Sequence, residues 1–437
     1  MIRHVFRFEW LHLMRSRAFQ LIAFVLPVTM FVSLYLGQQR VSTQLDTITE
    51  LAASERAFYL EQAERQRLIE QGELEVSAWF QDPGNPLVLA QFNDAGRFVI
   101  LHPRPLAALA VGQSDIFPYY GKVTLTNRVA MRDNALKNPV TYLSGSLDFA
   151  FVLIWLIPLF VIALGYDVRS REKESGTYVM LESQPVSVTR IMACKFAFRY
   201  SLLLLMALSS LALFSVILQI PLASHNGLIV VLYITGYMAF WFLLSVVVTM
   251  FSNRSAMNAI SLVGLWVLFI LIIPALITLY AGYKHPLPSR SLWVTELRAI
   301  EQEVNARRGE LFDAWKADHP EEYVAGETPG FYQTWMQRLV SNTYIHSQTR
   351  DADERFQVAV QRQHQAIHSL RLLSPPMILS HRLQVLAGTD RDRLGKLDEK
   401  MYDFQREWQD FFLPRFQQLN FFTSEEIQFI PVPERIR

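Results

Sequence analysis

Residues 148–166 read DFAFVLIWLIPLFVIALGY, an apolar run whose one charged residue stands at its start. A helix rises about 1.5 Å per residue, so about 20 apolar residues cross the hydrocarbon core of a bilayer. The run is also too long for an ordinary buried strand. It therefore predicts a transmembrane helix, and Pro158 near its middle predicts a kink.

Four further runs of this kind lie along the chain, and together they predict an α-helical polytopic membrane protein. The five predicted spans are residues 18–36, 148–166, 196–220, 228–251 and 258–281. Apolar residue types make up 51% of the 437 residues and charged types 19%, yet the mean hydropathy is only +0.17. These values indicate very apolar spans diluted by two long polar segments, residues 37–147 and 282–437.

Basic residues in the short flanking segments set the expected orientation, because cytoplasmic loops are enriched in Lys and Arg. Residues 1–17, 167–195 and 252–257 carry such cations, whereas residues 221–227 carry none. The N-terminus is therefore expected in the cytoplasm of a bacterial inner membrane. Both long polar segments and the C-terminus are expected outside it, in the periplasm. Residues 372–388 contain two prolines, a His and an Arg, and are not expected to cross back.

The two long polar segments predict two large extracytoplasmic domains of different class. In residues 37–147 a charge-rich helical stretch is followed by the turn-forming Pro83-Gly84-Asn85-Pro86 and then by short apolar runs between turn residues. This order predicts a mixed α/β domain. In residues 282–437 apolar residues recur at three- and four-residue spacing, as at Leu297, Ile300 and Val304. That spacing predicts a mainly helical domain.

Several functional classes are excluded by the composition and the motifs. The net charge of +1 argues against a nucleic-acid binder. The single cysteine, Cys194, excludes an internal disulfide and any CxxC site, and it is expected to be an inert thiol. The sequence has no P-loop, dinucleotide fingerprint, H-E-x-x-H or nucleophile elbow. The chain is therefore expected to bind no cofactor and to have no catalytic residue of its own.

The predicted spans carry no Asp, Glu, Lys or His away from their ends. Ion-coupled carriers usually need an ionisable group within the bilayer, so a proton-driven carrier is disfavoured. Na⁺ coordination by backbone carbonyls stays open. If this protein moves something, the energy is expected to come from another subunit. Arg199 stands close to the start of its span and is expected to snorkel towards the interface.

The N-terminal stretch IRHVFRFEWLHLMRSR, within residues 1–17, has an amphipathic pattern. Phe6, Trp10 and Leu13 share one helical stripe that the arginines avoid. We expect this helix to lie in the membrane interface as an elbow before the first span. The alternative is a plain positively charged flank.

The loop of residues 167–195 carries the strongest signal for a partner protein. A charged stretch precedes a break at Ser175-Gly176-Thr177, and a short apolar helical turn follows. Ser187 is placed to cap the helix that leads into the third span. A short cytoplasmic helix with charges and an apolar face, held between two spans, suits a mechanical coupling element.

His364 and His368 lie at i, i+4 on a predicted helix, a spacing that can place two imidazoles on one metal ion. No third ligand lies nearby in the sequence, and surface histidines recur in this way by chance. No metal site is assigned to them.

The loop and the N-terminal helix resemble those of type-2 ABC exporter permeases. In that family a cytoplasmic element with the pattern E-x-x-x-G-T, a leucine-rich turn, P-V-S and a basic residue joins the second and third spans. The matching residues are Glu172, Gly176, Thr177, Leu181, Pro185, Val186, Ser187 and Lys195. Residues 105–124 and 373–393 are similar to a subgroup with large extracytoplasmic domains, related to gliding-motility and copper-associated permeases.

The resemblance implies how this chain would work with partners. Separate ABC ATPase subunits would bind ATP and Mg²⁺, Glu172 and Glu174 would pair with their basic residues, and Gly176 would permit the turn. The coupling residues implied are Glu172, Glu174, Gly176, Thr177, Tyr178, Leu181 and Pro185.

Relatives usually have a sixth span, which this sequence does not show. Either a partner supplies the missing helix or this permease works with five spans. A second permease is therefore expected, a non-identical paralogue in preference to a second copy. An extracytoplasmic partner stays open.

Three functions stay open at this point. The favoured one is the transmembrane subunit of an ATP-driven exporter. The second is a complex that uses ATP to move its outer domains for signalling or mechanotransmission, without transporting a cargo. The third is a membrane-anchored receptor or scaffold without ATP coupling. Nothing in the sequence identifies a cargo.

Overall fold

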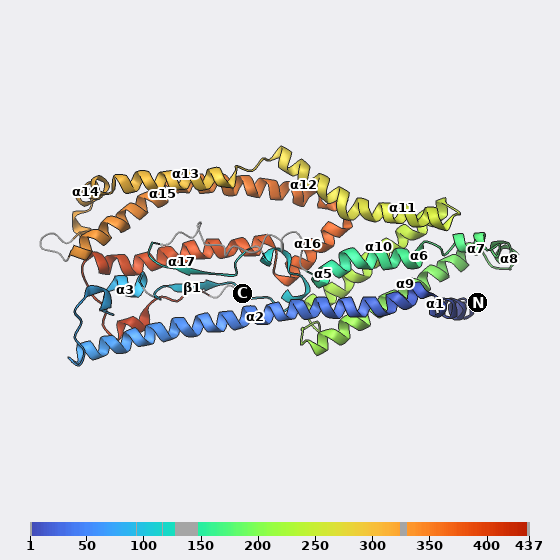
Figure 1. Ribbon diagram of the computed structural model, residues 1–437, viewed down its shortest axis with the longest axis horizontal. Helices are drawn as coiled ribbons and strands as arrows, with labels where there is room; N and C mark the ends of the chain where they lie inside the picture. Colours follow the sequence, from blue (N-terminus) through green and yellow to red (C-terminus); the bar gives the residue numbers. More distant parts are fainter. Residues whose placement is uncertain (1, 93, 116, 127–146, 324–329, 435–437) are drawn as a thin grey trace.

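The computed structural model describes residues 2–92, 94–115, 117–126, 147–323 and 330–434. The molecule is elongated and has two parts along its long axis (Figure 1). We call the N-terminal helix, the five candidate spans and the short loops between neighbouring spans the membrane bundle, and the remaining helices with the small sheet at the opposite end the distal body. The C-terminus is expected in the periplasm, but its last residues, 435–437, lie outside the described residues.

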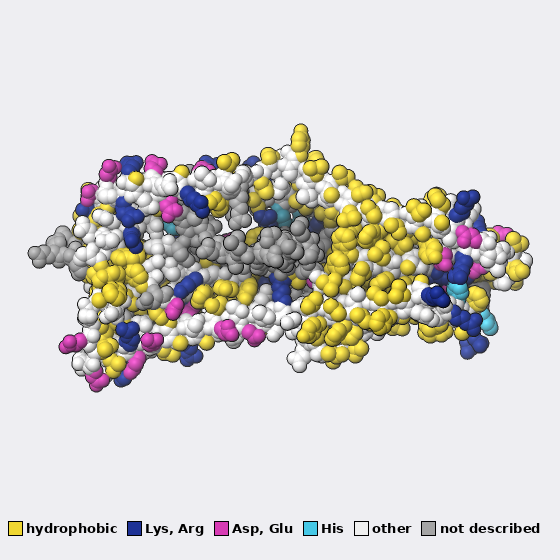
Figure 2. Space-filling model, in the orientation of Figure 1, with side chains coloured by type: hydrophobic (Ala, Val, Ile, Leu, Met, Phe, Trp, Pro, Cys, Tyr) yellow, Lys and Arg dark blue, Asp and Glu magenta, His cyan; other side chains and the backbone are white. Residues whose placement is uncertain are grey.

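The prediction of five membrane-spanning helices is confirmed. The candidate spans are Arg17–Glu70, Phe149–Glu174, Val188–Ile217, His225–Phe251 and Ser255–Lys284. Apolar side chains cover the surface of the bundle as a band, and charged side chains gather at its far end and over the distal body (Figure 2). This distribution is the one expected of a protein with one part in lipid and the remainder in water.

Two of the spans contain a π-helical turn that ends two residues before a proline. The second span consists of α5 (Phe149–Phe151), a π turn (Val152–Leu156) and α6 (Ile157–Gly165), and the fifth of α11 (Ser255–Val267), a π turn (Leu268–Ile272) and α12 (Ile273–Lys284). Pro158 lacks the N–H that would bind the Ile154 carbonyl one turn earlier, and the Tyr237 hydroxyl donates to that carbonyl at 3.1 Å instead. The irregularity expected at Pro158 is thus a π turn, whose freed carbonyl a neighbouring helix satisfies.

The first span continues without a break into the distal body. Helix α2 (Arg17–Glu70) has 54 residues and so is about 80 Å long. The predicted span boundary after residue 36 is therefore not a helix end. Gly37 lies in α2 where the helix passes a 3₁₀ turn, Ala107–Leu109, and a Cβ there would stand 2.0 Å from the Ala108 carbonyl oxygen. The glycine serves close packing against the distal body.

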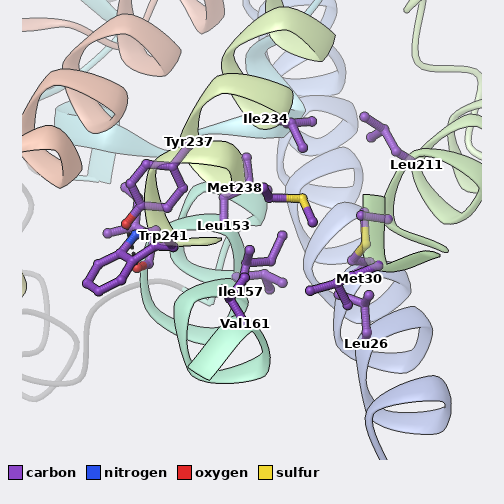
Figure 3. Packing of buried hydrophobic residues seen from close by; sticks show 14 of the residues in the cluster. Leu26, Met30, Leu153, Ile157, Val161, Leu211, Ile234, Tyr237, Met238 and Trp241 are labelled. Carbon is purple, nitrogen blue, oxygen red and sulfur yellow. Dashed lines mark hydrogen bonds between the residues drawn. The ribbon is translucent and has the colours of Figure 1, made fainter. Parts of the chain in front are cut away.

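The core of the bundle forms where α2, the second span, α9 (Val188–Ile217) and α10 (His225–Phe251) meet. Leu26 and Met30, one turn apart on α2, point towards Ile157 and Met238 (Figure 3). Helix α16 (Pro375–Ala387) packs against the distal-body end of the bundle, where Leu379 joins the same core. It lies within residues 372–388, and it is not among the helices long enough to span.

The distal body has one hydrophobic core, to which both long polar segments contribute. Trp408 and Phe412 from the second segment are fully buried in one cluster with Leu87 from the first. The indole of Trp408 donates to the Ala90 carbonyl at 3.3 Å. The sequence analysis predicts two separate domains, and the structure instead joins the two segments.

The predicted mixture of helix and strand in the first segment and the mainly helical second segment are both observed. Strands β1 (Arg97–Ile100) and β2 (Tyr120–Val123) form an antiparallel pair in which Arg97 lies opposite Val123. Among the described residues, the helices of the body are α3 (Pro86–Ala90), α13 (Arg290–Ala306), α14 (Arg308–Asp318), α15 (Gly330–Leu370), α16 and α17 (Arg391–Gln417), with 3₁₀ turns at Trp79–Gln81, Ala107–Leu109, Gly112–Asp115, Pro320–Glu322, Arg371–Leu373 and Glu426–Phe429.

Candidate functional site

Charged side chains are buried at the end of the bundle that holds the N-terminus. Lys195 and Arg199 stand one turn apart on α9, so both point to the same side. They meet Glu9 of α1 (Ile2–Arg15), Asp167 after α6 and Glu172 of α7 (Ser170–Glu174). We call these five residues the charged layer. It joins the N-terminal helix, two spans and the loop between them.

The distances within the charged layer are those of direct ion pairs. Lys195 Nζ lies 3.2 Å from Glu9 Oε1 and 2.5 Å from Glu172 Oε1. Arg199 Nε lies 3.0 Å from Glu9 Oε2, and its Nη1 lies 3.1 Å from Asp167 Oδ1. The side chains of Glu9, Lys195 and Arg199 are all more than nine-tenths buried. Separating such a pair would leave a buried charge without compensation, so the layer holds its helices together.

Arg199 is expected from the sequence to snorkel towards the membrane interface, and in the structure it does not. Its guanidinium turns into the bundle, where Glu9, Asp167 and the Leu164 carbonyl oxygen accept its hydrogen bonds. The physical reason is the carboxylate of Glu9, which another helix brings to the same level. An arginine with three acceptors inside the protein gains nothing by reaching for the interface.

The N-terminal helix is present as predicted, but its two faces differ from the expected stripe. Phe6 and Leu13 face the bundle, and the Phe6 ring lies 4.9 Å from that of Phe198. Glu9 is buried between them, whereas Trp10 points away from the bundle and is exposed. Exposed apolar residues at Phe8, Trp10 and Leu11 leave a second face free for lipid.

The loop between the second and third spans folds as two short helices around a glycine. Helix α7 ends at Glu174, Gly176 follows with φ of +74°, and α8 (Tyr178–Glu182) begins after Thr177. A positive φ is strained for residues with a β-carbon, so the glycine permits this turn as expected. Thr177 donates its hydroxyl proton to Glu172, which fixes α8 against α7.

Glu174 attaches the loop to the fifth span. Its carboxylate accepts hydrogen bonds from the Ser255 backbone N–H at 2.6 Å and from the Ser255 hydroxyl at 2.7 Å, at the first residue of α11. A carboxylate at a helix N-terminus is favoured by the helix dipole. Lys173 donates to Asn253 at 2.6 Å, and Arg169 donates to the Met250 carbonyl at 3.0 Å at the end of α10. The loop is thus tied to the bundle at several points.

The tip of the loop presents two apolar side chains to solvent. Tyr178 is half-buried with the Lys173 ammonium 4.9 Å from its ring centroid, and Leu181 packs against the bundle core. Between them Val179 is 69% exposed and Met180 70% exposed, while Pro185 lies exposed in the turn before α9. Apolar residues exposed together on a fixed element are typical of a protein contact.

Comparison with known proteins agrees with this arrangement. Residues 3–398 match the family described as ABC-2 family transporter protein. The chain belongs to this family. No curated protein and no solved structure matches it.

Membership makes this ABC-2 transporter protein a multi-pass membrane permease component that is not itself catalytic and that associates with an ABC ATPase. The resemblance to type-2 ABC permeases is confirmed, and the narrower subgroup stays a prediction.

Three members of the charged layer of this ABC-2 permease do not follow from the sequence. Glu9 and Asp167 are not singled out there, and Arg199 is not expected to be buried. One signal was available, because Glu9 is the only acidic residue in α1. Its partner Arg199 is 190 positions away, however, and the pairing follows only from the packing of α1 on α9. The sequence also does not show that Val179 and Met180 are exposed while Tyr178 and Leu181 are partly buried, because a helix of five residues is too short for its apolar periodicity to define a face.

The histidine pair of this permease has a third imidazole nearby. The ring centroid of His368 lies 5.4 Å from that of His381 on α16. Burial and nearby arginines, Arg391 for His364 and Arg371 for His381, lower the pKa of both imidazoles. Among the residues that the structure describes, no group of three or more His, Cys, Asp or Glu has the geometry to hold a metal ion.

Proposed function

We propose that this chain is the membrane subunit through which separate ATPase subunits drive export or extraction of a substrate across the bacterial inner membrane. The charged end of the bundle and the N-terminus would face the cytoplasm, where ATP and Mg²⁺ occupy the partner. The observation that carries the proposal is the exposed pair Val179 and Met180 at the tip of a loop whose hydrogen bonds reach the third, fourth and fifth spans.

The proposed contact with the ATPase uses apolar side chains. Glu172 and Glu174, which the resemblance assigns to basic residues of the ATPase, are both engaged within this chain. Burial of Val179 and Met180 in a groove of the ATPase would supply the binding free energy. The two glutamates would then pass the movement on, Glu172 to α9 and the N-terminal helix, and Glu174 to α11.

The proposed movement changes the tilt of the spans as a unit. When nucleotide binding draws two ATPase subunits together, each would displace its α8. Because the charged layer is buried and paired, its helices would follow the loop as rigid bodies rather than separate. A second permease, favoured as a non-identical paralogue, would supply the other half of the pathway.

The structure gives one observation in favour of mechanotransmission without cargo. Helix α2 runs unbroken for 54 residues from the charged end of the bundle into the distal body. A displacement at the charged layer would therefore move the distal body directly. Stimulation of the ATPase by a cargo would support transport, whereas stimulation only by an extracytoplasmic partner would support mechanotransmission.

The contact can be tested with matched substitutions. Val179→Asp should abolish copurification of the ATPase, because a charge would be buried in its groove. The same substitution at Val358, also exposed but on α15 of the distal body, should leave copurification unchanged. A Val179→Asp variant that retains the ATPase would contradict the proposed docking surface.

The transmission step has its own test. Glu174→Lys removes both hydrogen bonds to Ser255 and places a cation at the N-terminus of α11. It should uncouple transport and weaken ATPase copurification while expression and membrane insertion stay normal. Glu303→Lys on α13 is the matched control and should behave as the unmodified chain. Full transport in Glu174→Lys would show that force does not pass through this contact.

A further inference from the structure

A groove lies between the last turns of α12 and the C-terminal end of α15, where the bundle meets the distal body. Its cavity measures about 360 Å³. The residues that the argument uses are Tyr280, Lys284, Arg362, Gln365 and Ser369, which all line it. Nothing in the proposed function uses this groove.

The groove lies at the level where lipid headgroups are expected. Helix rise places Lys284 about 45 Å along the fifth span from Arg254 at the opposite end, which is the full thickness of a bilayer with both headgroup layers. The apolar part of the span ends just before it. The groove therefore opens at the headgroup layer of the leaflet nearer to the distal body.

The lining is cationic. Lys284 and Arg362 are both exposed, and none of the described residues that line the groove is acidic. In the described part of the chain neither side chain forms an ion pair. Gln365 adds neutral hydrogen-bond donors, and the Ser369 hydroxyl, which donates to the Ala366 carbonyl at 2.9 Å, adds an acceptor oxygen. Two unpaired cations with polar neighbours suit an oxyanion such as a phosphate.

More positive charge surrounds the end of α15. Arg371 and Arg382 lie on the side towards α16, and burial together with the Arg382 guanidinium lowers the pKa of Arg371. The carboxylate of Asp392 offsets this effect only in part. The electrostatic potential near the groove therefore favours an anion.

The residues of α12 below the groove suit an acyl chain. Leu276, Tyr280 and Lys284 follow one another at four-residue steps, so they form one column along the helix. Leu276 is exposed on α12, and Leu372 and Leu373 are exposed on the 3₁₀ turn that packs against α12. From the bundle outwards, the column presents an aliphatic, an aromatic and a cationic side chain. A phospholipid presents an acyl chain, an interfacial glycerol region and a phosphate in the same order, so each side chain lies at the level of a part of the lipid that it suits.

The geometry points to a binding site for an anionic phospholipid of this leaflet. Its phosphate lies between Lys284 and Arg362, its headgroup contacts Gln365 and Ser369, and one acyl chain follows Leu276. A lipid held there bridges α12 and α15, which already pack against each other, and so strengthens the joint that α2 and α16 also form between the bundle and the distal body.

The test measures lipid binding to the purified full chain by native mass spectrometry during titration with phosphatidylglycerol or phosphatidylcholine. The chain is expected to bind phosphatidylglycerol in preference. The double variant Lys284→Ala/Arg362→Ala should weaken that binding about tenfold or more, since each cation near a lipid phosphate contributes measurably. The charge-preserving Lys284→Arg/Arg362→Lys should bind within about twofold of the original chain.

Two controls make the result decisive. Arg298→Ala/Lys396→Ala changes the net charge equally on exposed residues away from the groove, and should leave binding unchanged. Inorganic phosphate should not displace the lipid at matched concentration, because it lacks the acyl contacts. Equal weakening in the control variant, unchanged binding in the groove variant, or ready displacement by inorganic phosphate would each overturn the assignment.

Discussion

The membrane bundle and the distal body both bury an apolar core, but they differ in the side chains that they expose. In the bundle Phe24 is 69% exposed, whereas the charged Arg199 and Glu9 are enclosed by other helices. In the distal body Phe412 is fully buried, whereas Arg67 and Glu64 form their ion pair at the surface. The difference shows that each part is folded for a different solvent. Lipid accepts an exposed phenyl ring and rejects a charge, and water does the reverse.

The same contrast decides which ion pairs hold the structure. The Arg67–Glu64 pair is solvated on both sides, and such pairs contribute little to stability. In the charged layer the side chains are buried and cannot be solvated, so removal of one partner leaves the other as an uncompensated buried charge. Charge is therefore structural in the charged layer, whereas in the distal body most ion pairs lie at the surface and the Arg97–Glu55 pair is a buried exception.

The largest expected effect on stability comes from removing a phenyl ring from the core of the distal body, compared with removing one from the lipid-facing surface of the bundle. Phe412→Ala should lower the free energy of unfolding of the distal body by about 4 kcal/mol, because it leaves a cavity in the aromatic core. Phe24→Ala removes the same atoms from a lipid-facing position of α2 and should change stability by less than about 0.5 kcal/mol. Denaturation followed by circular dichroism in detergent measures both. Similar losses would mean that Phe24 faces protein, for example a second permease, rather than lipid.

Arg199→Leu should have the next largest effect and lower the free energy of unfolding by about 3 kcal/mol. Glu9 would keep Lys195 as a partner, but among the described residues Asp167 would retain only the exposed Arg171, at 3.5 Å, as an ion-pair partner. Arg67→Leu is the matched substitution in the surface pair and should cost no more than about 1 kcal/mol. Thermal unfolding in the same detergent compares the two. If the two variants lose equal stability, the charged layer is hydrated and its role as a rigid joint fails.

The predictable part of the fold is the part that local sequence determines. Each span is a continuous apolar run, and the glycine turn of the loop shows in the short motif around Gly176. The continuity of α2 could not be predicted from the sequence, because a glycine after an apolar run usually marks the end of a helix. The role of Gly37 in close packing appears only when the fold places Ala108 beside it. The inward turn of Arg199 depends on Glu9 in the same way. Shared burial in the distal body depends on pairs as distant as Ala90 and Trp408.

A smaller effect is expected at the loop glycine. Gly176→Val should destabilise the turn by about 1–2 kcal/mol, because φ of +74° is strained for a β-branched residue even though no atom lies within 4 Å of the added Cβ. Gly264→Val, in helical backbone that is equally open, is the control and should be neutral. Asn tolerates positive φ, so Gly176→Asn should be milder. Copurification of the ATPase reports the loop itself, and an unaffected Gly176→Val complex would contradict a required turn geometry.

The smallest expected effect tests how the bundle satisfies its irregular backbone. Tyr237→Phe removes the only side-chain donor that the described residues offer to the Ile154 carbonyl, and should cost about 1 kcal/mol, as is typical of hydrogen bonds between membrane helices. Pro158→Ala restores an N–H one turn after Ile154, so the carbonyl would regain a donor within its own helix. In that background Tyr237→Phe should cost less than about 0.5 kcal/mol, and the difference is the coupling between the two sites. Unfolding titrations with sodium dodecyl sulfate on the four variants of this cycle measure it. Additive costs would mean that the hydroxyl does not compensate for the proline, and that the π turn is stabilised by side-chain packing instead.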